Sequence, residues 1–453
     1  MNDEVAKLRA RAEKDGVEFY FALFVDMHGK PCAKMIPVES TDVLVEGEAG
    51  FAGFAAGPMG HTPADGDLIA IPDLDTYTVL PWKRTIAIVM CDIFVEGEPW
   101  PFCPRLILKD AIAKAKEKGF VFKTGAEAEY FLVNRLEGGG IEVADPLDRA
   151  ASPCYDVKAL TRMYDVLSEL SKYMNELGWG NYANDHEDAN GQFEQNFEFA
   201  DALTTADRLI FFRYMVHMIA HDHGMAATFM PKPFSNLTGN GLHFHSSFWD
   251  ATTDKPLFSD DKDPRGMGMS ALGYQYIAGL LAHARALVAV TCPTVNSYKR
   301  MGVGPPTSGA TWAPAYASYG GNNRTQMLRI PSGGGRVENR GADGSANPYL
   351  AMAAQLVAGL DGIERNLDPG EPNVDNLFTL SEEAIAAKGI PQMPRTLLEA
   401  ADALRADEVM RQGLGTTRDG YYADYFADIK TEEFMSYHRQ VSHWEIDRYL
   451  TLF

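Results

Sequence analysis

The sequence predicts an α+β fold in which a small, mostly β N-terminal part precedes a larger part of mixed structure. The first hundred residues hold short runs of β-branched and aromatic residues separated by Gly and Pro, whereas the rest alternates strand patterns with long helical ones. With 453 residues, 46% of them hydrophobic, the chain can form a large core and more than one domain. The Pro101–Pro104 segment resembles a linker, so we expect domains at residues 1–104 and 105–453.

The expected elements follow the hydrophobic patterns along the chain. In the N-terminal part they are a polar helix at 3–14 and strands at 19–25, 31–36, 68–71 and 85–90. In the larger part they are helices at 106–118, 159–177, 206–221, 271–291, 348–366 and 431–450, and strands at 123–133, 226–229 and 241–249. The apolar run near 276–290 carries His283 and Arg285, so it is too short and too polar to span a bilayer.

The strand expected at 123–133 carries two acidic residues two positions apart. Side chains two apart share a face of a strand, so Glu127 and Glu129 point the same way, with Tyr130 on the other side. Adjacent carboxylates repel each other, and burying either alone is unfavourable. A bound hard cation removes both problems. An exposed acidic edge, or carboxylates paired with Lys or Arg, is the alternative.

A hairpin is expected farther along the chain, because Asn190-Gly191 is a strong signal for a two-residue turn. That turn would place Glu187 directly opposite Glu194. Like charges in opposed positions are destabilising, so a cation again resolves the conflict. A solvated hairpin tip is the alternative.

The strand at 241–249 has a polar face and an apolar face. His243, His245 and Ser247 alternate on one side, while Leu242 and Phe244 lie on the other. A single histidine is usually a core residue, but a pair at this spacing favours contact with a metal or a phosphate.

Arginines gather in the segment from 300 to 340 of an otherwise acidic chain. They are Arg300, Arg324, Arg329, Arg336 and Arg340. Arginine suits bidentate recognition of carboxylate and phosphate, and several of these residues flank the Gly-rich run at 333–335. Surface salt bridges are the alternative. The Gly-rich run lacks the Gly-Lys-Ser/Thr ending of a Walker A loop.

Charge and cysteine usage exclude several classes of protein. The net charge is -21 and no basic block occurs, so we expect neither nucleic acid nor an anionic membrane surface as a partner. The five cysteines are scattered without a CxxC pair, which is typical of free thiols in a reducing compartment. The first ten residues are charged and lack an apolar run, so we expect no signal peptide and a cytoplasmic protein.

Taken together, these motifs resemble the glutamine synthetase family, and the resemblance covers roughly residues 15–453. The motifs occur in the family's order: Gly125-Ala-Glu-Ala-Glu129, the hairpin of Glu187 and Glu194, Gly239-Asn-Gly-Leu-His-Phe-His245, Asn296-Ser-Tyr-Lys-Arg300, Asn323-Arg324 and Arg336-Val-Glu-Asn-Arg340. The resemblance implies an N-terminal β-grasp domain and a larger catalytic domain. It also implies a homo-oligomer, a dodecamer of two hexameric rings with sites between subunits.

The resemblance further implies ATP as a substrate and two divalent cations, Mg²⁺ or Mn²⁺, in each site. Glu129, Glu187 and Glu194 would hold the cation near glutamate, and Glu127, His243 and Glu338 the cation on the ATP phosphates. Gly239, Arg300 and Arg324 would bind glutamate; Arg300, Arg324 and Arg340 would act in catalysis; and His245, Ser247, Arg329 and Arg336 would lie near ATP. The implied chemistry is phosphorylation of the glutamate γ-carboxylate, followed by attack of an amine.

The sequence departs from the family's pattern where ammonium would bind. Ala52 stands where bacterial glutamine synthetases carry an Asp, and no Asp or Glu occurs between Arg300 and Arg324, where the family has a Glu in a flap over the site. Phe378 also replaces the Tyr that is adenylylated in some members.

Loss of both ammonium-contacting carboxylates predicts a small alkylamine, methylamine first, as the amine. Phe51, Phe54 and Trp312 are candidate walls for its alkyl group, and Glu48, Asp65 and Asp67 are candidate bases. The alternatives are a glutamine synthetase that uses ammonia, a γ-glutamylpolyamine synthetase, an unrelated metallohydrolase and a catalytically inactive structural homologue.

Overall fold

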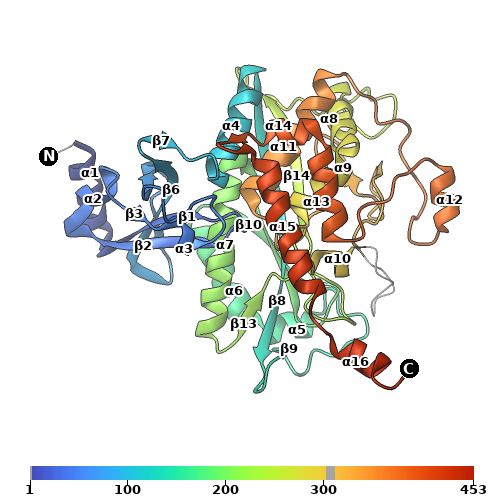
Figure 1. Ribbon diagram of the computed structural model, residues 1–453, viewed down its shortest axis with the longest axis horizontal. Helices are drawn as coiled ribbons and strands as arrows, with labels where there is room; N and C mark the ends of the chain where they lie inside the picture. Colours follow the sequence, from blue (N-terminus) through green and yellow to red (C-terminus); the bar gives the residue numbers. More distant parts are fainter. Residues whose placement is uncertain (1–2, 302–311) are drawn as a thin grey trace.

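A computed structural model describes residues 3–301 and 312–453 and confirms the α+β class (Figure 1). Two separate sheets carry most of the strands, a seven-stranded one before residue 100 and a ten-stranded one after residue 119. The boundary expected at 104/105 falls one residue inside α4 (Pro104–Glu117), and the division into two domains stays a prediction. Among the described residues, no helix is long and apolar enough to cross a membrane.

The N-terminal sheet has the order β2-β1-β6-β4-β3, with β5 and β7 added along β6. Its strands are β1 (Phe19–Val25), β2 (Pro31–Pro37), β3 (Gly50–Phe51), β4 (Leu68–Pro72), β5 (Thr78–Leu80), β6 (Lys83–Val95) and β7 (Glu98–Pro99), accompanied by helices α1 (Asp3–Asp15), α2 (Thr41–Val45) and α3 (Gly53–Ala56). The central pair, β1 and β6, is parallel, and the other pairs are antiparallel. This sheet forms the blue lobe at the left of Figure 1.

The second sheet is organised around β8 (Phe120–Arg135), which pairs with β11 and β14 on its two sides. The main path runs β10-β11-β8-β14-β17-β16-β15. Its strands are β9 (Ile141–Val143), β10 (Asn181–His186), β11 (Gln192–Phe197), β12 (Ala200–Asp201), β13 (Ala226–Thr228), β14 (Leu242–Asp250), β15 (Tyr319–Gly320), β16 (Leu328–Arg329) and β17 (Val337–Asn339), and a separate hairpin joins β18 (Thr416–Thr417) to β19 (Gly420–Tyr421).

Helices accompany this sheet, and several of them pack against its strands or against one another. They are α5 (Val157–Arg162), α6 (Tyr164–Glu176), α7 (Ala202–Asp222), α8 (Ala271–Ala282), α9 (Ala284–Thr291), α10 (Ser297–Arg300), α11 (Pro348–Glu364), α12 (Glu382–Ala387), α13 (Leu397–Ala406), α14 (Glu408–Gly413), α15 (Tyr422–His438) and α16 (His443–Tyr449). Helices α8 and α11 approach closely because Gly279 and Gly362 face each other; a Cβ on Gly279 would lie 2.1 Å from the Ala358 carbonyl oxygen.

Three of the expected helices are interrupted. The 159–177 helix is divided at Met163 into α5 and α6, the 271–291 helix at His283 into α8 and α9, and the C-terminal one after His438 into α15 and α16. At His283 the backbone leaves helical geometry (φ -104°, ψ 10°), and the ring lies 2.9 Å from Asp361 and 2.7 Å from Asp407. A tertiary ion pair therefore overrides a continuous apolar pattern at this position.

Candidate active site

The alternation predicted along β8 and β14 divides the sheet into an acidic face and an apolar face. Because the strands pair with His243 opposite Glu127, these two side chains meet on one side. On the other side Tyr130 and Phe244 are fully buried, and the Tyr130 ring packs against Phe212 of α7. Burial of the apolar face thus fixes the direction in which the acidic side chains point.

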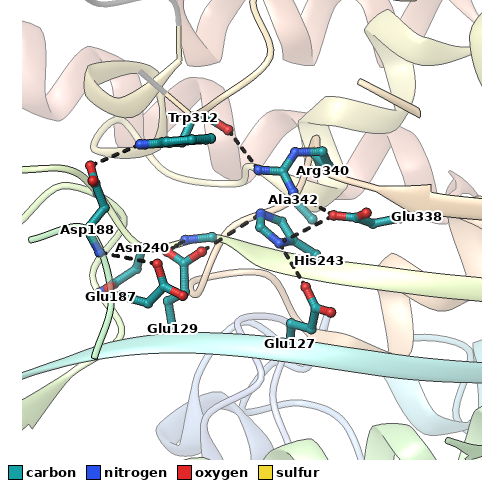
Figure 2. A network of polar contacts seen from close by, with 12 residues as sticks. Glu127, Glu129, Glu187, Asp188, Asn240, His243, Trp312, Glu338, Arg340 and Ala342 are labelled. Atoms are coloured by element: carbon teal, nitrogen blue, oxygen red, sulfur yellow. Dashed lines mark hydrogen bonds and ion pairs between the residues drawn. The ribbon is translucent and has the colours of Figure 1, made fainter. Parts of the chain in front are cut away.

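His243 lies at the centre of the acidic face (Figure 2). Its Nδ1 is 3.2 Å from a Glu127 oxygen and 3.7 Å from a Glu338 oxygen, and its Nε2 is 3.9 Å from a Glu129 oxygen. Three strands, β8, β14 and β17, therefore bring their polar residues to a single point.

Two overlapping groups of side chains have ligand atoms within 4.8 Å of one another. One consists of Glu127, His245 and Glu338, and the other of Glu127, Glu194 and His243. Glu127 belongs to both groups, and His245, which the sequence placed near ATP, joins the first. Glu129 is outside both groups and accepts hydrogen bonds from the Gly241 N–H at 2.6 Å and from Gln192. The predicted division of these ligands between two cations stays a prediction.

The hairpin expected at Asn190-Gly191 is present, but its predicted register is wrong. Asp185, not Glu187, lies opposite Glu194, and the loop spans five residues, 187–191. The reason lies outside the hairpin: the buried Asp148 accepts hydrogen bonds from the Asn190 amide and from the backbone N–H of residue 191, and it also contacts His186. Glu187 is consequently a loop residue that lines the site without pairing across the hairpin.

The carboxylates of the acidic face have strongly divergent pKa values. Burial, together with the charge of Glu129, raises the pKa of Glu187 to about 8. Burial and the neighbouring carboxylates, Glu127 first among them, raise the pKa of Glu194 well above its usual range. Burial acts in the same direction on Glu127, but hydrogen bonds from His243 and His245 outweigh it and hold the pKa of Glu127 below its usual range. The cluster thus holds more negative charge than its protein neighbours compensate.

Arginines approach this cluster from β16 and β17 and from the loops around them. Glu338 is fully buried and accepts hydrogen bonds from Arg329 and Arg340. The Arg336 Nε–H donates to His245 Nδ1 over 3.3 Å, and His245 Nε2 lies 2.9 Å from Glu127. Since Nδ1 accepts a hydrogen bond here, the ring proton is on Nε2, and the Nε2–H of His245 points at Glu127.

Two cavities adjoin the acidic face, and Glu127 borders both. The first, of about 540 Å³, is lined by residues including Lys123, Tyr182, Phe199, His245, Ser247, Trp249 and Arg336. The second, of about 470 Å³, is lined by residues including Glu129, Glu187, Glu194, Gly239, His243, Arg300, Arg324, Arg329 and Arg340. Apart from the fully buried Glu338, every residue predicted to bind the cations, glutamate or ATP borders one of the two cavities.

Several residues of the second cavity were not among the predicted site residues. Tyr155 and Asp188 border it, and Trp312, which the sequence proposed only as a wall for the amine, donates an indole N–H···O bond to Asp188 over 3.0 Å. The acidic run at 185–188 is a sequence signal for Asp188, whereas Tyr155 has no such signal. Residues 302–311 of the expected flap lie outside the described residues.

The other residues proposed for the amine belong to the N-terminal part of the chain and border neither cavity. The Phe51 ring packs on Phe24, and the Phe54 ring stacks on His61. Asp65 is bound to Arg418 and Thr62, and the hydrogen bond from Arg418 is the main cause that lowers the pKa of Asp65. An ion-paired carboxylate of low pKa is a poor proton acceptor.

Comparison with known proteins gives matches over nearly the whole chain. Residues 101–449 match the family described as "Glutamine synthetase, catalytic domain". The chain is 45% identical to a glutamate–methylamine ligase of Methyloversatilis universalis, over 97% of this chain and 98% of that protein. It is 43% identical to a glutamine synthetase of Rhizobium meliloti over 96% and 97% of the two chains. The solved structure titled "GmaS/ADP complex-Conformation 1" superposes with a TM-score of 0.91 at 45% identity, covering 98% of this chain and 99% of that one.

Proposed function

The chain belongs to the glutamine synthetase family, and from that premise we propose that it is an ATP-dependent glutamate–amine ligase that prefers methylamine. The reaction would join the glutamate γ-carboxylate to the amine through γ-glutamyl phosphate. The observation that carries the choice of amine is the missing pair of carboxylates: Ala52 replaces one, and no acidic residue occurs between Arg300 and Arg324 to supply the other. The similarity to a glutamate–methylamine ligase agrees with this choice.

The acidic face fits two divalent cations. Carboxylate oxygens with one or two imidazoles suit Mg²⁺ or Mn²⁺. Burial and the neighbouring carboxylates, which raise the pKa values of Glu187 and Glu194, disfavour their ionised forms, and a cation would compensate for both. The proposed ligands are Glu129, Glu187 and Glu194 on the glutamate side and Glu127, His243 and Glu338 on the ATP side, with His245 close enough to join the latter. When bound, the cations would neutralise charge on the phosphates during transfer.

The arginines of the second cavity supply positive charge where a phosphoryl group would transfer. A γ-carboxylate oxygen attacks the terminal phosphorus of ATP, and ADP leaves; Arg340 and Arg324 would stabilise the charge that spreads over the transferring oxygens. Arg300 would bind glutamate beside Gly239, whose position admits no side chain because a Cβ there would lie 2.2 Å from the Pro231 carbonyl oxygen. The amine nitrogen then attacks the γ-carbonyl carbon, phosphate leaves, and the nitrogen loses a proton.

The first cavity is the proposed nucleotide site. His245, Ser247 and Arg336 line it beside the acidic face, while the exposed Tyr182 and the partly buried Trp249 supply aromatic surface for a base. Arg329, which bonds to Glu338, would reach the phosphates between the two cavities. The related structure solved as an ADP complex supports nucleotide use by this fold.

We propose a homo-oligomer, a dodecamer of two stacked hexameric rings. Supporting this, the tail from residue 441 to the last residue, which includes α16, leaves large apolar side chains exposed: Val441, Trp444, Leu450, Leu452 and Phe453 are each more than half exposed. Figure 1 shows this tail running away from the body of the chain. Contiguous exposed apolar side chains favour a protein partner. Phe51 and Phe54 would then reach an amine only from a neighbouring subunit. We also propose a cytoplasmic location.

An amine screen tests the proposed function. The values of kcat/KM for methylamine, ethylamine, putrescine and ammonium are measured at saturating ATP and glutamate, with product identified by mass. We expect methylamine to give the highest value. An ammonium value equal to or above that of every alkylamine would indicate an ordinary glutamine synthetase, and putrescine in first place would indicate a polyamine ligase.

A further inference from the structure

Two aromatic residues with strained backbones face the second cavity. Among the described residues, five non-glycine residues have positive φ, and two of these, Tyr155 (φ 62°) and Trp312 (φ 55°), line this cavity. The left-handed region is unfavourable for bulky side chains and persists where surrounding structure enforces it. Such backbone strain gathers at ligand sites.

Trp312 is fixed at both its backbone and its side chain. Its indole N–H donates to Asp188 over 3.0 Å, and its carbonyl oxygen accepts a hydrogen bond from Arg340 over 3.4 Å. Asp188 in turn accepts a hydrogen bond from the buried Thr238 hydroxyl. Figure 2 shows Trp312 and Asp188 together on the opposite side of the acidic face from Glu127. The indole is therefore held beside a nearly buried carboxylate, over the face where the ligation would occur.

An aromatic face next to a carboxylate is chemically suited to an alkylammonium ion. The carboxylate accepts the ammonium protons, and the ring attracts the positive charge while packing against the alkyl group. No acidic residue occurs between Arg300 and Arg324, so a carboxylate beside Trp312 must come from another part of the chain. Asp188 is such a carboxylate.

We propose that Trp312 and Asp188 form the alkylammonium subsite: the indole sets the preference for methylamine over ammonium, and the Asp188 carboxylate binds the cationic head of either amine. This inference rests on the proposed function and adds the residues that determine the amine. It also replaces Phe51 and Phe54 as the main candidate walls, since neither of those rings borders this cavity.

The two residues have different expected effects. Trp312→Ala removes the contact with the methyl group, and one methyl in an apolar pocket accounts for about 10–200-fold in kcat/KM. We therefore expect the methylamine-to-ammonium ratio of kcat/KM to fall at least about tenfold, while ethylamine and longer amines gain relative to methylamine because the cavity is larger. Asp188→Asn keeps the shape and can still accept from the indole, but it removes the charge, so methylamine and ammonium should lose activity together at a nearly constant ratio.

The test measures all four amines with wild type, Trp312→Ala, Trp312→Phe and Asp188→Asn at saturating ATP and glutamate. Trp312→Phe keeps an aromatic ring and guards against a folding defect in the alanine variant; it should retain a larger share of the methylamine preference. Tyr182→Ala truncates an exposed aromatic residue of the other cavity and should leave the amine ratio unchanged even if its KM for ATP rises.

The outcomes separate this inference from the proposed function. If wild type prefers ammonium, the proposed function fails whatever the variants do. If wild type prefers methylamine but Trp312→Ala and Trp312→Phe keep its amine ratio, Trp312 does not set the preference and the inference is overturned. An Asp188→Asn variant with unchanged KM for both amines would overturn the role of the carboxylate.

Discussion

Cation binding to the acidic face should release protons, and Glu187→Gln should remove about one of them. In the cation-free chain, burial and the charge of Glu129 raise the pKa of Glu187 to about 8, and burial with Glu127 raises the pKa of Glu194 well above its usual range. A ligated carboxylate must be ionised, so Mg²⁺ or Mn²⁺ displaces these protons on binding.

The magnitude follows from the titration of Glu187. A carboxyl group of pKa about 8 holds about 0.9 of a proton at pH 7 and about 0.1 at pH 9. Wild type should therefore release between about one and two protons per subunit at pH 7, with Glu194 supplying the remainder, and about 0.8 fewer at pH 9. The same raised pKa means that the cation-free protein loses stability as pH rises from the ordinary carboxyl range toward 8, and that a cation restores it.

Isothermal titration calorimetry in two buffers of different ionisation enthalpy measures the released protons. Titrations at pH 7 and pH 9 with wild type, Glu187→Gln and the exposed control Glu137→Gln complete the design. We expect Glu137→Gln to match wild type and Glu187→Gln to release about one proton fewer at pH 7. Proton release near zero in wild type at pH 7, or equal release in the two glutamine variants, would refute the assignment of Glu187 as a buried cation ligand.

Three further predictions concern a proposed cation ligand, a buried histidine and the loop that carries Phe378. Glu129→Ala should abolish turnover and weaken Mg²⁺ binding, because it removes one of three proposed carboxylate ligands; near-normal activity at limiting Mg²⁺ would contradict this. His283→Leu should lower the free energy of unfolding by roughly 3–5 kcal/mol below pH 6, since it removes the ion-pair partner of Asp407 and leaves Asp361 with Arg365 alone. Although burial opposes it, those hydrogen bonds raise the pKa of His283, so its contribution fades as pH rises through the raised value, and chemical denaturation from pH 6 to 9 should show the two proteins converging. Because Phe378 lacks a hydroxyl, protein isolated from its host under nitrogen excess should show no added AMP on that loop by mass spectrometry.

The alternating strands were the most predictable part of the site. Apolar and polar residues alternate along β8 and β14, and this alternation determines which face of the sheet packs against the core. The common direction of Glu127 and His243 therefore follows from the periodicity of the sequence. The clustering of arginines at 300–340 favoured recognition of carboxylate or phosphate, and the resemblance to the glutamine synthetase family implied their roles in the site. Their individual partners, such as Arg329 with Glu338, depend on strand pairing that one sequence does not specify.

The hairpin shows where local signals stop being sufficient. Asn190-Gly191 correctly indicated a reversal of the chain, but Asp148, some forty residues earlier, binds these two residues and lengthens the loop. A two-residue turn would have paired Glu187 with Glu194 across a rigid ladder. In the five-residue loop, Glu187 lies outside the paired strands, so cross-strand pairing does not fix the direction of its side chain. The interruption at His283 has the same origin, since its two partners come from α11 and from the residue before α14.

The amine side of the cavity lacks the two carboxylates that the family uses for ammonium, but it contains the carboxylate of Asp188. Missing carboxylates alone explain why ammonium would bind poorly, but they do not explain how a cationic amine is held in a cavity with several arginines. Asp188 resolves this difficulty, because Thr238 and Trp312 orient it through neutral donors, which leave its negative charge uncompensated. A charge that an arginine had neutralised would attract no ammonium group. The identity of the donors to Asp188, and not only its presence, is therefore what makes it suitable for binding an amine.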